Sequence, residues 1–189
     1  PGRKPVDAGP YVPSPQSVVA DMLKLANVNA NDFVIDLGSG DGRIVITAAK
    51  QYGTRGIGFD LDPQRIKEAN ENAARNNVTG KVDFRLGDLF EADIREATVV
   101  TLYMLPEFNA KLRPIMERQL KPGTRVVSHD YPIEGWVADR VEDDGDAGIF
   151  FGADEAADAL TEFEDGLGDA VFREGVAARI LVGVVVVET

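Results

Sequence analysis

An apolar run that ends in an acid and opens directly into a glycine-rich turn constrains this chain more than any other feature. Residues 33–37 read Phe-Val-Ile-Asp-Leu, glycines follow at Gly38, Gly40 and Gly42, and a helical pattern begins at once. Glycine at every second position gives a turn whose backbone a ligand can approach closely, and a helix that begins there directs free N–H groups toward that ligand. The segment therefore predicts a strand, a tight ligand-binding turn and a helix N-terminus.

The same strand-then-helix order repeats along the chain and predicts an α/β fold. We expect strands at residues 33–36, 56–60, 81–86, 97–103, 124–128, 138–142 and 177–188. We expect helices at residues 42–52, 63–76 and 107–120, preceded by an amphipathic helix that Ser14 caps, Pro15 opens and Asn27 ends. The pattern predicts a doubly wound, Rossmann-like sheet, mostly parallel with an antiparallel last strand, and helices on both faces.

A length of 189 residues suits one domain. Residues 1–10, with their three prolines and two glycines, are expected to be a flexible lead-in to a single domain at 11–189. From Glu142 to Phe172 the chain carries eleven acidic and no basic residues, so most of its net charge of −12 is local. This acidic insert, at about 143–172, has helical spacing at 154–163. It is expected either to steer cationic protein substrates or to be a solubilising, partly disordered loop.

Composition excludes several classes of protein. The chain has no cysteine and one histidine, so disulfides, thiolate metal sites and histidine-rich metal centres are not expected. The acidic balance argues against nucleic acid as a partner. No apolar run approaches the ~20 residues of a membrane span. We expect a cytoplasmic protein; because the chain starts at Pro1 rather than methionine, a targeting segment removed before Pro1 is the alternative. The oligomeric state is left open.

The acids around the glycine turn favour a cationic ligand. Asp36 precedes the turn and Asp41 lies inside it, and two carboxylates would repel a pyrophosphate but suit the ammonium and sulfonium of S-adenosylmethionine. Asp60 ends the next strand, 18 residues after Gly42, close to the spacing of an acid that binds ribose hydroxyls. Ligands of such sheets bind at the carboxyl ends of the strands. The expected cofactor-binding residues are Asp36, Gly38, Ser39, Gly40, Asp60, Leu61, Asp88, Leu89 and Tyr103.

The chain resembles the class I, seven-stranded S-adenosylmethionine-dependent methyltransferases. Within that class, residues 10–136 are similar to the small prokaryotic protein-lysine methyltransferases related to the mitochondrial ATP synthase c-subunit lysine methyltransferase. The class likeness rests on DLGSGDG at 36–42, followed by Asp60 and by Gly87-Asp88. The closer likeness rests on PYVPSP at 10–15, GDLFEAD at 87–93, ATVVTLYMLP at 97–106 and LKPGTRVVSH at 120–129. The relatives join their last two strands by a much shorter connection than the acidic insert.

The resemblance implies an acceptor channel for a lysine side chain. Nucleic-acid amino-methyltransferases of this fold carry an Asn/Asp-Pro-Pro-aromatic motif after the fourth strand, whereas residues 102–106 here read Leu-Tyr-Met-Leu-Pro. An apolar site with one phenol suits an aliphatic lysine stem. Tyr103, Tyr11 and Pro106 are the expected channel residues, the tyrosines acting by cation–π contact or hydrogen bonding. The structural alternatives are that Tyr11 only packs on the first helix and that Tyr103 packs in the core.

Other interpretations of the chain stay open at this point. His129 and Asp130 follow the fifth strand, either as a base and its orienting acid or as a hydrogen-bonded support of that loop. Arg43 is expected to be solvated or paired with Asp41. The function expected first is methylation of protein lysine ε-amines, with S-adenosylhomocysteine as the product. The alternatives are a small-molecule N- or O-methyltransferase and a catalytically silent S-adenosylmethionine-binding module.

Overall fold

The computed structural model describes residues 11–143 and 181–186. The lead-in at 1–10, the helical spacing at 154–163 and the acidic insert beyond Asp143 lie outside these described residues. The helices are α1 Gln16–Leu25, α2 Arg43–Tyr52, α3 Pro63–Arg75, the short 3₁₀ helix η1 Leu89–Glu91 and α4 Pro106–Gln119. The strands are β1 Phe33–Leu37, β2 Arg55–Asp60, β3 Val82–Leu86, β4 Val99–Leu102, β5 Arg125–His129, β6 Arg140–Asp143 and β7 Leu181–Val186.

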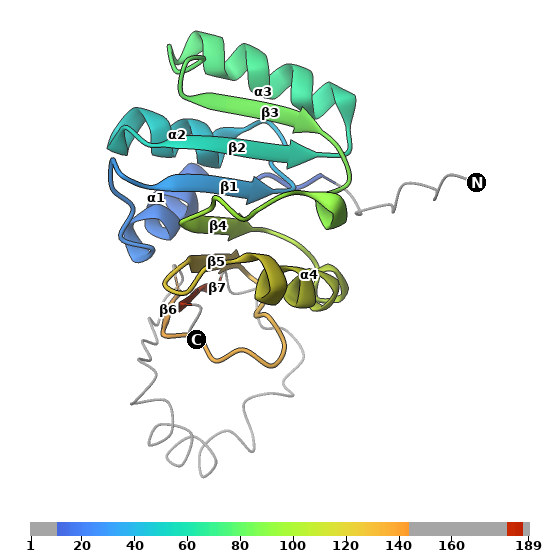
Figure 1. Cartoon of the computed structure of the whole chain (residues 1–189). Coiled ribbons are helices and arrows are strands. Elements are labelled where there is room, and N and C mark those ends of the chain that lie inside the picture. Colours follow the sequence, from blue (N-terminus) through green and yellow to red (C-terminus); the bar gives the residue numbers. More distant parts are fainter. Residues whose placement is uncertain (1–10, 144–180, 187–189) are drawn as a thin grey trace, which may run out of the picture.

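The strands form one seven-stranded sheet in the order β3-β2-β1-β4-β5-β7-β6 (Figure 1). Strands β1 to β5 pair in parallel, and β7 runs antiparallel to both β5 and β6. The chain reverses direction across the sheet between β1 and β4, which is where ligands of doubly wound sheets bind. The expected Rossmann-like sheet with an antiparallel last strand is confirmed.

Strand alternation places the helices on two faces of the sheet. On one face, Val34, Val99 and Val127 pack with α1 and α2, and a neighbouring cluster joins α2 to α3. On the other face, Ile35, Val100 and Val126 pack with α4 and η1. Neighbouring residues of a strand point to opposite faces, so each central strand contributes to both cores. This explains why the strands are almost continuously apolar and confirms helices on both faces.

The start of α1 departs from the expectation. The helix begins at Gln16 with Pro15 as its N-cap residue, and no side chain caps it. The hydroxyl of Ser14 instead lies 2.8 Å from Nδ1 of His129, at the end of β5, and both residues are buried. The predicted Ser14 cap is therefore wrong, because a buried side chain 115 positions away takes the hydrogen bond.

Candidate active site

The glycine turn after β1 has a backbone that only glycine adopts readily. Gly38, Gly40 and Gly42 have φ of 87°, 52° and 80°. A Cβ on Gly40 would lie 2.3 Å from Cε2 of Tyr11, so a side chain there would collide with that ring as well as strain the backbone. The turn is held against β2, because the amides of Gly38 and Ser39 both donate to the carbonyl of Phe59.

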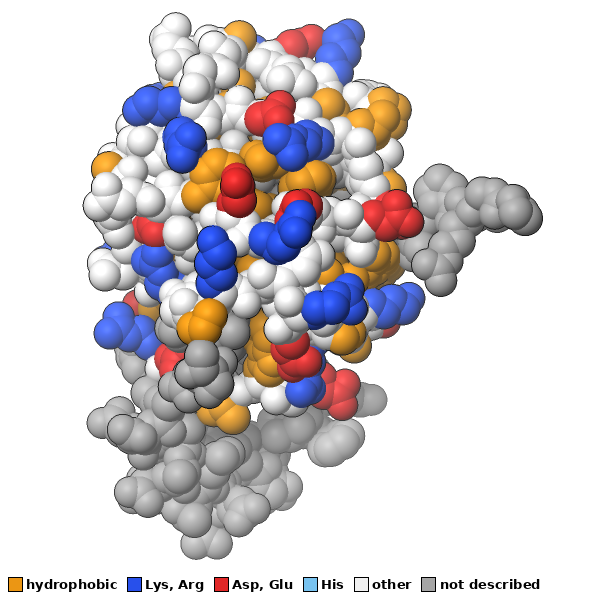
Figure 2. Space-filling model, viewed as in Figure 1, with side chains coloured by type: hydrophobic (Ala, Val, Ile, Leu, Met, Phe, Trp, Pro, Cys, Tyr) orange, Lys and Arg blue, Asp and Glu red, His pale blue; other side chains and the backbone are white. Residues whose placement is uncertain are grey.

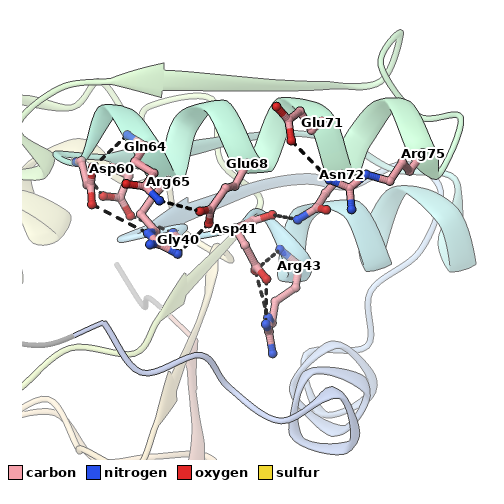
Figure 3. Close-up of polar contacts among 11 residues, drawn as sticks. Gly40, Asp41, Arg43, Asp60, Gln64, Arg65, Glu68, Glu71, Asn72 and Arg75 are labelled. Atoms are coloured by element: carbon pink, nitrogen blue, oxygen red, sulfur yellow. Dashed lines mark hydrogen bonds and ion pairs between the residues drawn. The ribbon is translucent and has the colours of Figure 1, made fainter.

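Asp60 fixes the same turn from the end of β2. One of its carboxylate oxygens accepts from the Gly40 amide at 2.7 Å, and the other accepts from the Asp62 amide at 2.9 Å (Figure 3). Each oxygen retains further acceptor capacity, because an ionised carboxylate has about four lone-pair sites. Asp60 can therefore accept from a vicinal diol while still holding the turn.

Asp36 is a buried acid at the end of β1. It is 2% exposed, and the hydroxyl of Thr101 donates to its carboxylate at 2.7 Å from the paired position on β4. Burial raises the pKa of Asp36 to about 7, and the nearby charges of Asp60 and Asp41 add to the rise. A buried acid beside other acids is stabilised in its charged form by a cation.

Tyr11 and Arg43 cover the turn from the N-terminal side. Arg43 pairs with the Asp41 carboxylate at 2.7 Å (Figure 3). Arg43 also donates to the backbone carbonyl of Ser14. Burial would raise the pKa of Asp41, but the Arg43 bonds outweigh it and lower that pKa. The guanidinium of Arg65 lies 4.4 Å from the Tyr11 ring centroid. The contact of Arg65 with Tyr11 and that of Arg43 with Ser14 thus hold residues 11–14 against the turn.

Aromatic side chains form the other side of the site. Tyr103 follows β4, and its ring centroid lies 4.0 Å from that of His129 and 6.4 Å from that of Tyr131. Met104 is buried beside Gly38, where a Cβ on the glycine would meet its sulfur at 2.8 Å. This side offers phenols and apolar surface where the turn side offers carboxylates and backbone.

The two sides enclose a cavity of about 590 Å³, within the usual range for small-molecule sites. Of the residues expected at the site, the cavity is lined by Tyr11, Asp36, Gly38, Ser39, Asp60, Leu61, Leu89 and Tyr103. Three others do not line it. Gly40 lies beneath Tyr11, the Asp88 carboxylate accepts from the Phe90 amide to cap η1, and Pro106 starts α4.

Sequence reasoning missed part of the lining. Asp62 caps α3, Arg65 lies on its first turn, and Tyr131 lies two residues beyond β5; all three line the cavity. No motif marked them, although a position just past the carboxyl end of a parallel strand was a usable signal for Tyr131. Of the two alternatives for Arg43, the pairing with Asp41 is confirmed. His129 is hydrogen-bonded to Ser14, and its role as a base or as a support of its loop stays a prediction.

The lining fits a cationic nucleoside such as S-adenosylmethionine. Four carboxylates line the cavity, those of Asp36, Asp41, Asp60 and Asp62, and one of them is buried. The hydroxyl of Ser39 is also buried, and among the described residues it has no hydrogen-bond partner. A buried polar group without a partner costs stability unless a ligand supplies one. In residues 11–143 and 181–186, no group of three or more acids or histidines could hold a metal ion.

A parallel Rossmann-like sheet with an antiparallel strand beyond β5, a glycine turn after β1 and an acid at the end of β2 defines a class I S-adenosylmethionine-dependent methyltransferase. The chain belongs to the family of the ANTKMT methyltransferase domain, whose model matches residues 36–140.

Individual relatives agree with this family. A protein-lysine N-methyltransferase of Saccharolobus islandicus is 51% identical over 128 residues, which are 67% of this chain and 80% of that protein. The human lysine N-methyltransferase of the ATP synthase c-subunit is 31% identical over 136 residues, 72% of this chain and 58% of that protein. The chain thus matches less than two thirds of the human relative's length.

A solved structure matches almost the whole chain. The RNA methyltransferase from Salinibacter ruber, crystallised with S-adenosyl-L-homocysteine, is 45% identical, covers 94% of each chain and has a TM-score of 0.73. S-Adenosylmethionine is accordingly the cofactor of this chain. None of the helices in the described part is long and apolar enough to span a membrane.

Proposed function

We propose that this methyltransferase acts on lysine ε-amines of proteins. The observation that carries the proposal is the segment after β4, where Tyr103, Met104 and Leu105 line the cavity with one phenol and apolar surface. This segment has no acid or amide to hold the exocyclic amino group of a base. The 51% identical relative from Saccharolobus islandicus is named a protein-lysine N-methyltransferase, which supports the same acceptor.

The turn side of the cavity would hold the cofactor. Asp60 accepts from the ribose hydroxyls while it keeps the Gly40 amide in place. Asp36 faces the cationic end of the cofactor from its buried position, and Ser39 gains a partner for its hydroxyl. Leu61 and Leu89 offer apolar surface to the adenine. Asp88 would act through the backbone of η1, which it caps.

The opposite side of the cavity, formed by Tyr103, Met104 and Tyr131, is the acceptor side. It must receive a neutral amine. Deprotonating a lysine of pKa ~10.4 at pH 7 costs about 4–5 kcal/mol, and an apolar channel lowers that cost because it disfavours the charged form. Tyr103 is not the base: burial and the Asp130 carboxylate raise its pKa to about 12, so it stays a neutral phenol. The channel residues therefore desolvate and orient the amine, which loses its proton to water.

Bound at the turn, S-adenosylmethionine would supply the methyl group. The amine lone pair forms the new N–C bond as the C–S bond breaks, and the electrons of the broken C–S bond remain on sulfur. In-line placement of an amine already held in the channel provides most of the remaining rate enhancement. Tyr103 and Met104, fixed by packing against His129 and Gly38, set that placement from the protein side.

RNA is the competing acceptor, because the similar structure from Salinibacter ruber is named an RNA methyltransferase. A net charge of −12 opposes a polyanion. On the face shown in Figure 2, Lys and Arg side chains are scattered among acidic and apolar ones rather than gathered into one cationic surface. These observations favour a cationic protein segment over RNA.

The test is to incubate the full chain with methyl-deuterated S-adenosylmethionine and, in parallel, a host proteome, host RNA and a metabolite extract. Mass spectrometry should find the label on lysine residues and in neither other pool, and at a cofactor concentration below saturation Asp60→Ala should lower it. Label confined to RNA or to metabolites would overturn the lysine proposal. Cofactor binding without transfer to any pool would identify a silent binding module.

A further inference from the structure

Exposed apolar side chains gather where the cavity opens to solvent. In the part of the chain that the structure describes, the large apolar side chains that remain exposed are those of Tyr11, Val12, Leu86, Leu105 and Val137. Three of them, Tyr11, Val12 and Leu105, also line the cavity and form what we call its apolar rim. Single exposed apolar residues are ordinary on a protein surface, whereas several around one site mark a surface that binds an apolar partner.

Two segments far apart in the sequence bring Val12 and Leu105 to the cavity, and buried neighbours hold each of them. Leu105 is the N-cap residue of α4 and follows the buried Met104. Val12 lies two residues before Ser14, whose hydroxyl is 2.8 Å from Nδ1 of the buried His129. The backbone at both positions is therefore anchored in the core, although the Val12 side chain is 57% exposed and that of Leu105 37%.

Both rim residues lie next to the acceptor side. Leu105 is two residues from Tyr103, in the segment that follows β4. The segment that carries Val12 reaches Tyr103 through Ser14, because the His129 ring that contacts Ser14 lies 4.0 Å from the Tyr103 ring between centroids. A lysine that enters the acceptor side would therefore bring the residues beside it in its own chain close to the apolar rim.

The charged groups around the cavity do not favour an acidic neighbour of that lysine. The basic residues of the lining are each paired with an acid, Arg43 with Asp41 at 2.7 Å and Arg65 with Glu68 at 2.6 Å. A substrate carboxylate would also be repelled by the four carboxylates that line the cavity. Apolar contact is the interaction that the rim itself offers.

We infer that Val12 and Leu105 determine substrate specificity: they bind apolar side chains that directly precede or follow the methylated lysine. The partner is thus a protein segment in which the acceptor lysine has apolar neighbours. This inference rests on the proposed lysine acceptor and adds the chemistry of the sequence around it.

The expected size of this preference follows from the openness of the rim. Docking an apolar side chain against Val12 and Leu105 removes apolar surface of both partners from water. In an enclosed hydrophobic pocket one methylene changes kcat/KM by about 10–200-fold, and a half-exposed rim should give the low end of that range. The contacts are made away from the reacting atoms and are present before the chemical step, so they should act mainly on KM.

The test compares synthetic peptides that differ only at the two residues beside a single lysine, which are leucine in one peptide and serine in the other. With the full chain and saturating S-adenosylmethionine, kcat/KM should be about tenfold higher for the leucine peptide. Val12→Ser and Leu105→Ser should each lower this ratio to about threefold, and the double variant should bring it close to one. The control Val137→Ser, at a residue that is 68% exposed and outside the lining, should keep the tenfold ratio.

A ratio within twofold for the wild type, or a tenfold ratio that survives in the double variant, would overturn the inference. A third peptide with arginine at both positions tests charge instead, and its preferred use over the leucine peptide would also overturn the inference.

The proteome experiment gives an independent readout, because labelled lysines should have apolar neighbours more often than unlabelled lysines of the same proteins. Should neither peptide be methylated, the neighbours of the labelled lysines decide. Lysines labelled without regard to their neighbours would overturn this inference and leave the lysine proposal intact. Label confined to RNA or metabolites would overturn both.

Discussion

The two sides of the cavity are built in different ways. The turn side consists of backbone and carboxylates within short stretches of chain, and its Gly40–Asp60 bond spans 20 positions. The acceptor side depends on contacts between distant segments, such as Ser14 with His129, 115 positions apart. The turn side therefore follows from local sequence, whereas the acceptor side exists only once the sheet has assembled. Substitutions on each side should then separate cofactor binding from turnover.

The largest separation is expected from Tyr103→Ala. Loss of the ring and its hydroxyl should lower kcat by about 100-fold, because amine placement and hydrogen bonding are lost together. The affinity for S-adenosylmethionine, measured by calorimetry, should change by less than about threefold, on the order of 0.6 kcal/mol. An affinity loss as large as the loss of turnover would contradict the division of the cavity into a cofactor side and an acceptor side.

Asp60→Ala should have the converse effect. Removing the carboxylate leaves the Gly40 amide without its acceptor and the ribose without a partner, so cofactor affinity should fall tenfold or more. With saturating cofactor, turnover should recover to within a few-fold of wild type. The matched control is Asp83→Ala, whose carboxylate pairs with exposed Arg85. Unchanged affinity by calorimetry would refute the role of Asp60.

The raised pKa of the buried acid Asp36 predicts that cofactor affinity, which belongs to the turn side, depends on pH. Its pKa is about 7, and only the ionised form attracts a cation, so cofactor affinity should fall as pH falls, by roughly tenfold between pH 8 and pH 6. Asp36→Asn should flatten this profile. In the free protein the sign is opposite: a raised pKa stabilises the fold at low pH, and that contribution is lost as pH rises through about 7.

An effect on stability, with the smallest change in binding and turnover, is expected at the contact that joins the N-terminal segment to β5. Ser14→Ala removes the partner of His129 Nδ1, which should lower the free energy of unfolding by about 1–3 kcal/mol in urea titrations. The exposed neighbour Ser17, changed to Ala, is the control and should stay within about 0.5 kcal/mol of wild type. Equal values for the two variants would show that the buried contact contributes nothing.

The difference between the local contacts of the turn side and the distant contacts of the acceptor side also explains which features could be predicted from the sequence. The described helices were placed to within about one residue at most ends, because a proline at a helix start, such as Pro63, is a local signal. Asp36, Ser39 and Asp60 were found for the same reason: each occupies a fixed position relative to a strand end. Ser14 was misread as a cap, since a local rule cannot see His129 across the sheet.

On the acceptor side, Tyr103 was found from its place after β4, but Tyr131 was not assigned to it. Tyr131 follows a residue in the left-handed conformation, and its carbonyl is held by the side-chain amide of Asn109 from α4, a contact that no local pattern reveals. Pro106 was expected in the channel because it is apolar and close in sequence to Tyr103. It starts α4 instead and does not line the cavity, since a helix that begins there turns the chain away.

The most direct test of a cavity divided between a cofactor side and an acceptor side is a crystal structure of the full chain with S-adenosylhomocysteine and a peptide carrying its labelled lysine. The ribose hydroxyls should lie on the Asp60 carboxylate, and the lysine nitrogen should lie beside the Tyr103 oxygen, between the cofactor sulfur and Tyr131. A lysine that enters from the Asp60 side, or a nucleoside bound against Tyr131, would contradict the account.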